Sequence, residues 1–137
     1  MAASADHDAL LTVHELERRA HLEGDARLLA STFADHIWEA SRGQLTRLSR
    51  ADVEERFRAY FATVRYSVWD DLLAPHVWVA PEGRSGWMAV HIEARLTGTG
   101  GDAPSNREFE SAWIATYEKV DGRWLMTGIA SSVVERD

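Results

Sequence analysis

The dipeptide Asp121-Gly122 constrains the fold of this chain most, because it joins two strand-like runs, Glu108 to Tyr117 and Trp124 to Val134. A tight hairpin turn needs positive φ at both central residues, and Asp-Gly meets this need readily. A two-residue turn sets Val120 opposite Arg123 and fixes the register outward from there. The C-terminal third is therefore predicted to be an antiparallel hairpin.

Counting outward from this turn divides the hairpin between two faces. The first face mixes large aromatic side chains with very small ones, which leaves a hollow and predicts a pocket; it carries Phe109, Ser111, Trp113, Ala115, Tyr117, Trp124, Met126, Gly128, Ala130 and Ser132. The second face is mostly aliphatic and carries Ile114, Thr116, Leu125, Ile129 and Val133. The alternative is a three-residue loop with a bulge. It would shift the register by one residue and exchange the partners given above.

Length, charge and cysteine content narrow the class of protein. The 137 residues fit a single domain spanning 1–137, with residues 1–7 expected to be flexible. The net charge of −7 and the scattered arginines argue against nucleic-acid binding. The chain has no cysteine, which excludes disulfides, thiol nucleophiles and cysteine-ligated metals. We see no signal peptide, and no segment approaches the roughly 20 apolar residues that span a bilayer. We therefore expect a soluble, cytoplasmic protein without membrane contact.

Apolar residues at helical spacing predict three helices in the N-terminal half. The first runs from Asp8 to Leu22, and the second, capped by Asp25, runs from Ala26 to Phe33. The third follows a capping box formed by Ser49 and Asp52. It presents an apolar stripe of Val53, Phe57, Tyr60, Phe61 and Val64.

Extended segments fill most of the remaining chain. They are His36–Arg42, Gln44–Leu48, Tyr66–Ala80 with an interruption at Pro75, and Ser85–Thr97, and the glycine-rich segment Gly98–Ser105 connects two strands. Helices followed by antiparallel strands predict an α+β fold in which three helices pack on a strongly curved antiparallel sheet. No element is left to cover the outer sheet face, so we expect a homodimer built on Val90, Ile92, Ile114, Leu125 and Ile129.

The order of these elements resembles the nuclear transport factor 2-like superfamily, particularly its SnoaL-like and ketosteroid isomerase-like branches. The resemblance covers nearly the whole chain and is carried by Gly24-Asp25, the helix from Ser49 to Val64, and the ending from Ala112 to Trp124. The stretch from Pro75 to Trp124 also resembles the calcium/calmodulin-dependent kinase II association domain. The resemblance implies a cone of helices and curved sheet around a pocket, with members ranging from isomerases and dehydratases to noncatalytic scaffolds.

The functional residues of these families do not carry over. Many relatives have histidines in the last strand, where this chain has Gly128-Ile129-Ala130-Ser131-Ser132. Positions that match Glu93 and Ala115 hold pocket arginines in the kinase association domain, which suggests that these two residues point inward. An anion clamp of that type is not expected here.

His91 and Glu93 are the candidate catalytic residues, because they share one strand face. If that face is concave, they lie near Trp113 and Ala115 and form an acid/base pair in an aromatic pocket. The alternative is a structural hydrogen-bonded pair, with Arg95 in the network. The His-x-Glu spacing with a third histidine is too weak to predict a metal, and we expect no metal and no cofactor.

The candidate ligand pocket is lined by His14, Trp38, Tyr60, Trp113 and Tyr117. Trp113 and Tyr117 beside small residues suit a flat apolar or aromatic ligand, although the same residues also fit ordinary core packing. Two functions therefore stay open. One is binding of a small molecule with isomerase or lyase chemistry, and the other is a noncatalytic dimerisation or scaffold domain of the same fold.

Overall fold

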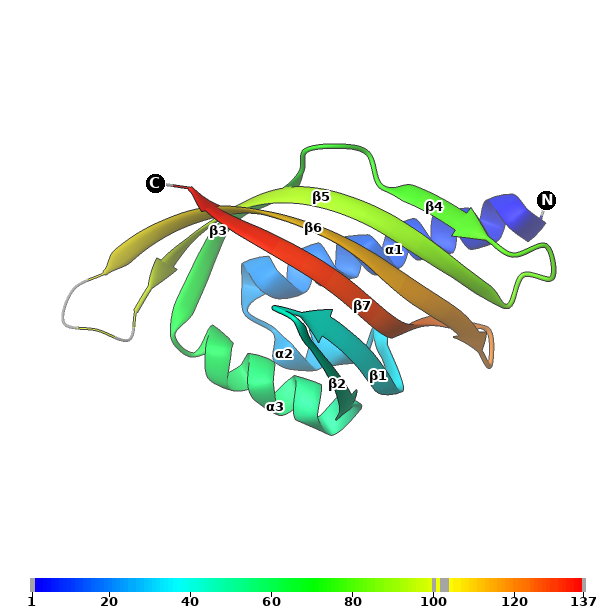
Figure 1. Ribbon diagram of the computed structural model, residues 1–137, viewed down its shortest axis with the longest axis horizontal. Helices are drawn as coiled ribbons and strands as arrows, with labels where there is room; N and C mark the ends of the chain where they lie inside the picture. Colours follow the sequence, from blue (N-terminus) through cyan, green and yellow to red (C-terminus); the bar gives the residue numbers. More distant parts are fainter. Residues whose placement is uncertain (1, 100, 102–103, 137) are drawn as a thin grey trace.

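The computed structural model describes residues 2–99, 101 and 104–136, and in this part of the chain three helices lie on one side of a curved seven-stranded sheet (Figure 1). The helices are α1 (Ala2–Glu23), α2 (Ala26–Ala30) and α3 (Arg50–Phe61). The strands are β1 (Phe33–Ser41), β2 (Gln44–Ser49), β3 (Val64–Asp71), β4 (His76–Val79), β5 (Ser85–Gly98), β6 (Ser105–Val120) and β7 (Arg123–Arg136). The predicted α+β architecture is confirmed.

The predicted helix caps are present. Asp25 accepts a hydrogen bond of 3.0 Å from the backbone N–H of Leu28 at the start of α2. Ser49 and Asp52 form the reciprocal capping box of α3. Strand β1 already begins at Phe33, where the sequence suggested the end of a helix, because α2 closes after Ala30.

Helix α1 begins at Ala2 instead of Asp8, so it includes the described residues of the segment 1–7. Asp6 in this segment is buried and accepts a hydrogen bond of 3.1 Å from Trp124 Nε1. The ammonium group of Lys119 lies 2.7 Å from the same carboxylate and lowers the pKa of Asp6. These contacts hold the start of α1 against the β6–β7 hairpin. None of the described helices is long and apolar enough to cross a membrane.

The strand order is β2-β1-β7-β6-β5-β3, and β4 pairs with another part of β5. All pairings are antiparallel except the one between β1 and β7, which is parallel. The sheet is therefore mixed, whereas the sequence predicted an antiparallel one. Strands β5 and β6 also extend further than predicted toward the Gly98–Ser105 connection, of which residues 100, 102 and 103 lie outside the described part.

The register of the β6–β7 hairpin is confirmed near the turn and changes further away. Val120 pairs with Arg123 across a two-residue turn in which Asp121 and Gly122 both have positive φ. A bulge at Thr127 then shifts the register, because Tyr117 pairs with Met126 and the preceding Thr116 pairs with Gly128. Beyond the bulge Ile129 and Ser131, and not Gly128, Ala130 and Ser132, share the inner face with Trp113.

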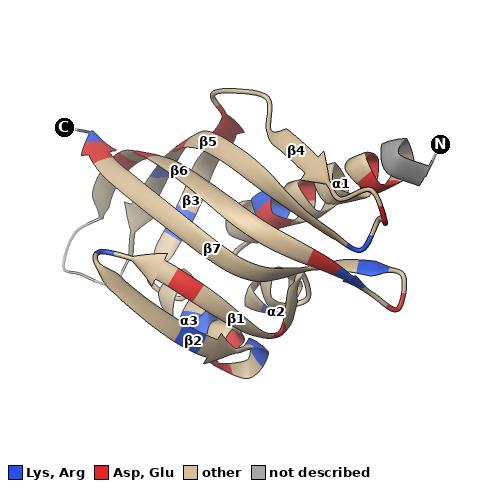
Figure 2. Ribbon diagram, turned by 45° about the vertical axis from the view of Figure 1, so that its right-hand side comes forward, with Lys and Arg blue, Asp and Glu red and all other residues tan. Residues whose placement is uncertain are grey.

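The register between β5 and β6 corrects the predicted outer face. Val90 pairs with Trp113, and both side chains are buried on the inner face together with Ile92. Val90, Ile92 and Ile129 therefore do not belong to the outer face, while Ile114 does and is 54% exposed. Figure 2 shows that the middle parts of β5, β6 and β7 carry few charged residues, which gather toward the strand ends.

Candidate functional site

An interior cavity of about 170 Å³ lies between the helices and the inner face of the sheet. It is lined by Glu17, His21, Leu29, Phe33, Glu39, Phe57, Trp69, Ser111, Trp113, Met126, Ile129 and Ser131. An apolar cavity of about 150 Å³ holds a benzene molecule in another protein. The cavity therefore matches the size of a single six-membered ring.

Glu17 is the acidic group in the buried part of this cavity. It lies on α1, is 5% exposed, and its Oε1 accepts a hydrogen bond of 3.2 Å from the hydroxyl of Tyr117. Burial raises the pKa of Glu17 to about 8, and the hydrogen bond from Tyr117 opposes that rise. The Glu17 carboxyl is consequently mostly protonated at neutral pH, yet close enough to its pKa to exchange a proton.

His21 lies one helical turn after Glu17. Its Nδ1 is 2.7 Å from the backbone carbonyl oxygen of Glu17, which can only accept, so this nitrogen carries the proton. Burial lowers the pKa of His21 to about 4, and the ring stacks on Trp69 with centroids 3.7 Å apart. The imidazole is therefore neutral at physiological pH and offers Nε2 as a hydrogen-bond acceptor.

Two indole N–H groups in the cavity wall are unsatisfied. Within the described residues, Nε1 of Trp69 and Nε1 of Trp113 are buried and have no hydrogen-bond partner. Such groups are rare in folded proteins and are normally satisfied by a water or ligand atom. Both residues line the cavity, and the two nitrogen atoms are themselves buried.

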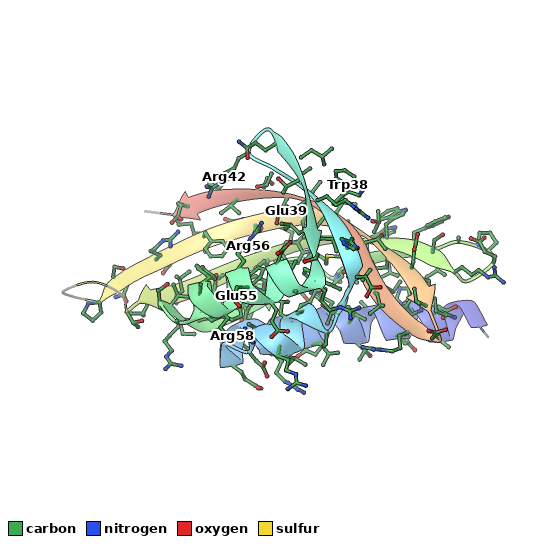
Figure 3. The ribbon with its side chains drawn as sticks, turned by 90° about the horizontal axis from the view of Figure 1, so that it is seen from below. Trp38, Glu39, Arg42, Glu55, Arg56 and Arg58 are labelled. Atoms are coloured by element: carbon green, nitrogen blue, oxygen red, sulfur yellow. The ribbon has the colours of Figure 1, made fainter. Side chains whose placement is uncertain are left out.

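Glu39 lies at the more exposed end of the cavity, on β1. Its carboxylate accepts two hydrogen bonds from Arg56 Nη1 on α3, at 3.1 Å and 2.9 Å. Figure 3 shows these two side chains next to each other between the β1–β2 hairpin and α3. No group of three or more metal-ligating side chains is found among the described residues.

Of the pocket residues predicted from the sequence, Trp113 lines the cavity and Tyr117 contacts it through Glu17. The other three lie elsewhere. His14 is buried and its Nε2 lies 2.7 Å from Asp71 Oδ1, while the hydroxyls of Tyr60 and Tyr66 are 2.6 Å apart. Trp38 is 51% exposed.

The structure places His91 and Glu93 on the outer face of the sheet, away from the cavity. On the concave face, His91 would share a face with Trp113. His91 instead pairs with Ala112, the neighbour of Trp113 in the strand, so its side chain points to the opposite face. His91 Nε2 lies 3.0 Å from Glu110, and Arg136 binds both Glu110 and Glu93. His91 and Glu93 are thus connected through Glu110 and Arg136 instead of forming the expected hydrogen-bonded pair, and Arg95 pairs with Glu108.

Sequence reasoning missed Glu17 and His21, although α1 contains a signal for them. Both continue the spacing of the apolar stripe formed by Leu10, Val13 and Ala20, so both face the sheet. Polar residues on the buried stripe of an amphipathic helix therefore identify this site better than polar residues on a strand.

Comparison of the sequence with protein-family models and with curated proteins finds no match. Solved structures, in contrast, match over nearly the whole chain. A conserved protein from Planctomyces limnophilus has a TM-score of 0.77 at 17% identity, covering 97% of this chain and 99% of its own. A ketosteroid isomerase-like protein from Erwinia carotovora atroseptica has a TM-score of 0.69 at 13% identity, covering 96% and 98%. An NTF2-like protein from Cytophaga hutchinsonii has a TM-score of 0.69 at 12% identity, covering 93% and 97%.

Other similar structures are provisionally named as a calcium/calmodulin-dependent kinase II association domain and as a dehydratase of the NTF2-like family. At these identities the likeness concerns the fold. The chain has the nuclear transport factor 2-like fold, an α+β cone in which the helices and the curved sheet enclose the cavity described above.

Proposed function

We propose that the protein binds a small, mainly apolar single-ring molecule in the interior cavity and moves a proton on it, as a cofactor-independent isomerase or lyase. The observation that carries this proposal is the carboxyl group of Glu17, which lines the cavity and has a pKa of about 8. A general acid or base works best when its pKa lies near the working pH. Structures named as ketosteroid isomerase-like and as a dehydratase share the fold, which agrees with this class of chemistry.

Glu17 and the two tryptophans have separate roles in this reaction. The ionised form of Glu17 takes a proton from a carbon next to a carbonyl group of the ligand. The carbonyl oxygen, on which negative charge develops, accepts hydrogen bonds from Trp69 and Trp113. Protonated Glu17 then returns the proton to another carbon in an isomerase, or a leaving group departs in a lyase.

Proton exchange tests this proposal without knowledge of the natural substrate. Cyclohexanone fits the ring size of the cavity, and exchange of its α protons in D2O is followed by NMR. We expect the protein to accelerate this exchange and Glu17→Gln to remove the acceleration while the fold is kept, because glutamine resembles the protonated carboxyl. His91→Gln is the control, since His91 lies on the outer face. Loss of exchange in His91→Gln with full exchange in Glu17→Gln overturns the proposal.

We also propose that the protein forms a homodimer through the outer face of the sheet. A groove of about 490 Å³ on this face is lined by Leu73, Ala74, His76, Ala89, His91, Ala112, Ile114, Ala130 and Ser132, together with Val90, Trp113 and Ser131, whose side chains lie on the inner face. Leu73 is 66% exposed and Ile114 is 54% exposed beside this groove, which favours burial against another protein surface. The names of the association-domain structures agree with assembly through this fold.

Light scattering tests the dimer. Ile114→Asp is expected to produce monomers, whereas Val120→Asp at the hairpin end, which is also exposed, is expected to leave the dimer intact. A dimer that survives Ile114→Asp removes this interface. If the dimer forms and no proton exchange is found, the noncatalytic dimerisation domain becomes the better description.

A further inference from the structure

A second, polar pocket adjoins the interior cavity at its exposed end. It measures about 320 Å³ and is lined by Glu39, Ser41, Arg42, Gln44, Thr46 and Arg56. Glu39 lines both spaces, so the polar pocket and the cavity meet at the ion pair between Glu39 and Arg56. Figure 3 shows the side chains of Glu39 and Arg56 between the β1–β2 hairpin and α3, and the side chain of Arg42 near the tip of the hairpin. A ring ligand in the cavity would reach this pocket with a substituent that extends past Glu39.

The polar pocket carries an excess of positive charge in a chain whose net charge is −7. Two arginines and one glutamate line it, and Glu39 is already paired with Arg56. Among the described residues, Arg42 has no ion-pair partner. The neighbouring Arg58 on α3 is paired with Glu54 and Glu55, so the charges of those three side chains are engaged with one another.

A tight turn sets the backbone conformation of Arg42. Ser41 pairs with Gln44, and the two residues between them, Arg42 and Gly43, have φ of 54° and 76°. A two-residue turn with positive φ at both positions favours asparagine and glycine, and arginine is an uncommon choice there. The turn places this side chain at the pocket, facing the same space as Arg56.

The ion pair between Glu39 and Arg56 can be replaced by a ligand. Its side chains are 27% and 45% exposed, and pairs that remain in contact with water are weak. Both hydrogen bonds to Glu39 come from Nη1 of Arg56, whereas a planar guanidinium group can bind a carboxylate through two of its nitrogens. A carboxylate on a ligand, assisted by Arg42 and by the hydroxyl and amide groups of the pocket, can thus take the place of Glu39 on Arg56.

We propose that the polar pocket is a carboxylate subsite, in which Arg56 and Arg42 bind the acid group of a single-ring carboxylic acid and Glu39 competes for the same arginine. This inference rests on the proposed function, because it takes the interior cavity as the site of the ring. It adds the chemical class of the ligand, an aromatic or alicyclic acid with its carboxylate at the cavity mouth.

Paired probes that differ only in charge test the subsite. Dissociation constants are measured by titration calorimetry on the full chain for benzoate and 3-phenylpropionate, and for the two corresponding neutral amides. At least one carboxylate is expected to bind about tenfold more tightly than its amide, because only the carboxylate forms charge-assisted hydrogen bonds with the arginines. Arg56→Gln and Arg42→Gln are each expected to reduce that advantage, and Glu39→Gln is expected to strengthen carboxylate binding, because it removes the competitor for Arg56.

Arg47→Gln is the matched control. Arg47 lies on the same hairpin but pairs with Trp38 and does not line the pocket, so the same change in net charge is expected to leave the preference intact. The double variant Glu39→Gln/Arg56→Gln leaves the net charge of the pocket unchanged and is expected to keep only the part of the carboxylate preference that Arg42 provides.

The outcomes separate the two proposals. If the amides bind and the carboxylates bind no better, or if Arg47→Gln weakens carboxylate binding as much as Arg56→Gln does, the subsite is wrong and the cavity remains the ring site. If neither the amides nor the carboxylates bind, the ring site and the subsite are both wrong.

Discussion

The hydroxyl of Tyr117 on β6 donates a hydrogen bond of 3.2 Å to Oε1 of Glu17 on α1, which joins residues 100 positions apart in the sequence. Tyr117 is 1% exposed, so its hydroxyl is held by the packing of the sheet. The hydrogen bond favours the ionised carboxylate, whereas burial of Glu17 disfavours it, and burial is the larger effect. The balance between them keeps the Glu17 pKa near the physiological range.

Tyr117→Phe tests this balance. Removal of the donor is expected to raise the pKa of Glu17 further, because the hydrogen bond from Tyr117 lowers it. The loss of one buried hydrogen bond is expected to reduce the free energy of unfolding by about 1 kcal/mol. The pKa is measured by carbon NMR of the Glu17 carboxyl group during a pH titration. An unchanged Glu17 pKa in a folded Tyr117→Phe variant contradicts the role assigned to this contact.

The pH dependence of proton exchange follows from the same pKa. Glu17 acts as a base only when it is ionised, so the exchange rate is expected to rise with pH and to level off above a pH of about 8. Tyr117→Phe should move this rise to higher pH. The rate is measured with cyclohexanone in D2O buffers from mildly acidic to alkaline pH. A rate that is already at its maximum in mildly acidic buffer excludes Glu17 as the base.

Glu17 and His21 also make the stability of the fold depend on pH, with opposite signs. The pKa of Glu17 rises from 4.5 to about 8 on folding, so between these values the folded chain holds a proton that the unfolded chain has lost, and stability falls as pH rises. The pKa of His21 falls from 6.5 to about 4, so between these values the unfolded chain holds the extra proton, and stability rises with pH.

The two contributions are expected to cancel between pH 4.5 and 6.5 and to leave Glu17 alone between pH 6.5 and 8. The free energy of unfolding of the native chain should therefore be level in the first interval and fall in the second, by about 1.4 kcal/mol per pH unit. In Glu17→Gln it should rise through the first interval and be level in the second. Urea denaturation at a series of pH values measures both curves, and parallel curves would show that Glu17 ionises alike in the folded and unfolded chains.

The sequence predicted those features of the fold that depend on local chemistry. The capping box at Ser49 and the positive φ of Asp121 and Gly122 follow from preferences of a few neighbouring residues. The family resemblance, carried by such local features and their order, gave the correct cone-like fold.

The candidate site was harder to predict, because it depends on registers that local chemistry does not set. Alternation divides a strand into two faces but does not say which face is concave, and His91 was assigned to the wrong one. A bulge has the same effect along a single strand, since one extra residue at Thr127 exchanges the faces of everything after it. Glu17 and His21 were overlooked because charged residues on a surface helix are usually solvated.

Substitution of two neighbouring serines tests the bulge and the cavity together. Ser131 lines the cavity, whereas Ser132 pairs with Ala112 and is exposed on the outer side. Ser131→Leu is expected to fill part of the 170 Å³ cavity and to abolish binding and proton exchange of ring ligands, with little loss of stability because the space is already present. Ser132→Leu is expected to leave ring binding unchanged. A hairpin without the bulge would give the reverse result, since Ser132 would then face Ser111 inside the cone, so the measured affinities of the two variants for cyclohexanone decide between the two registers.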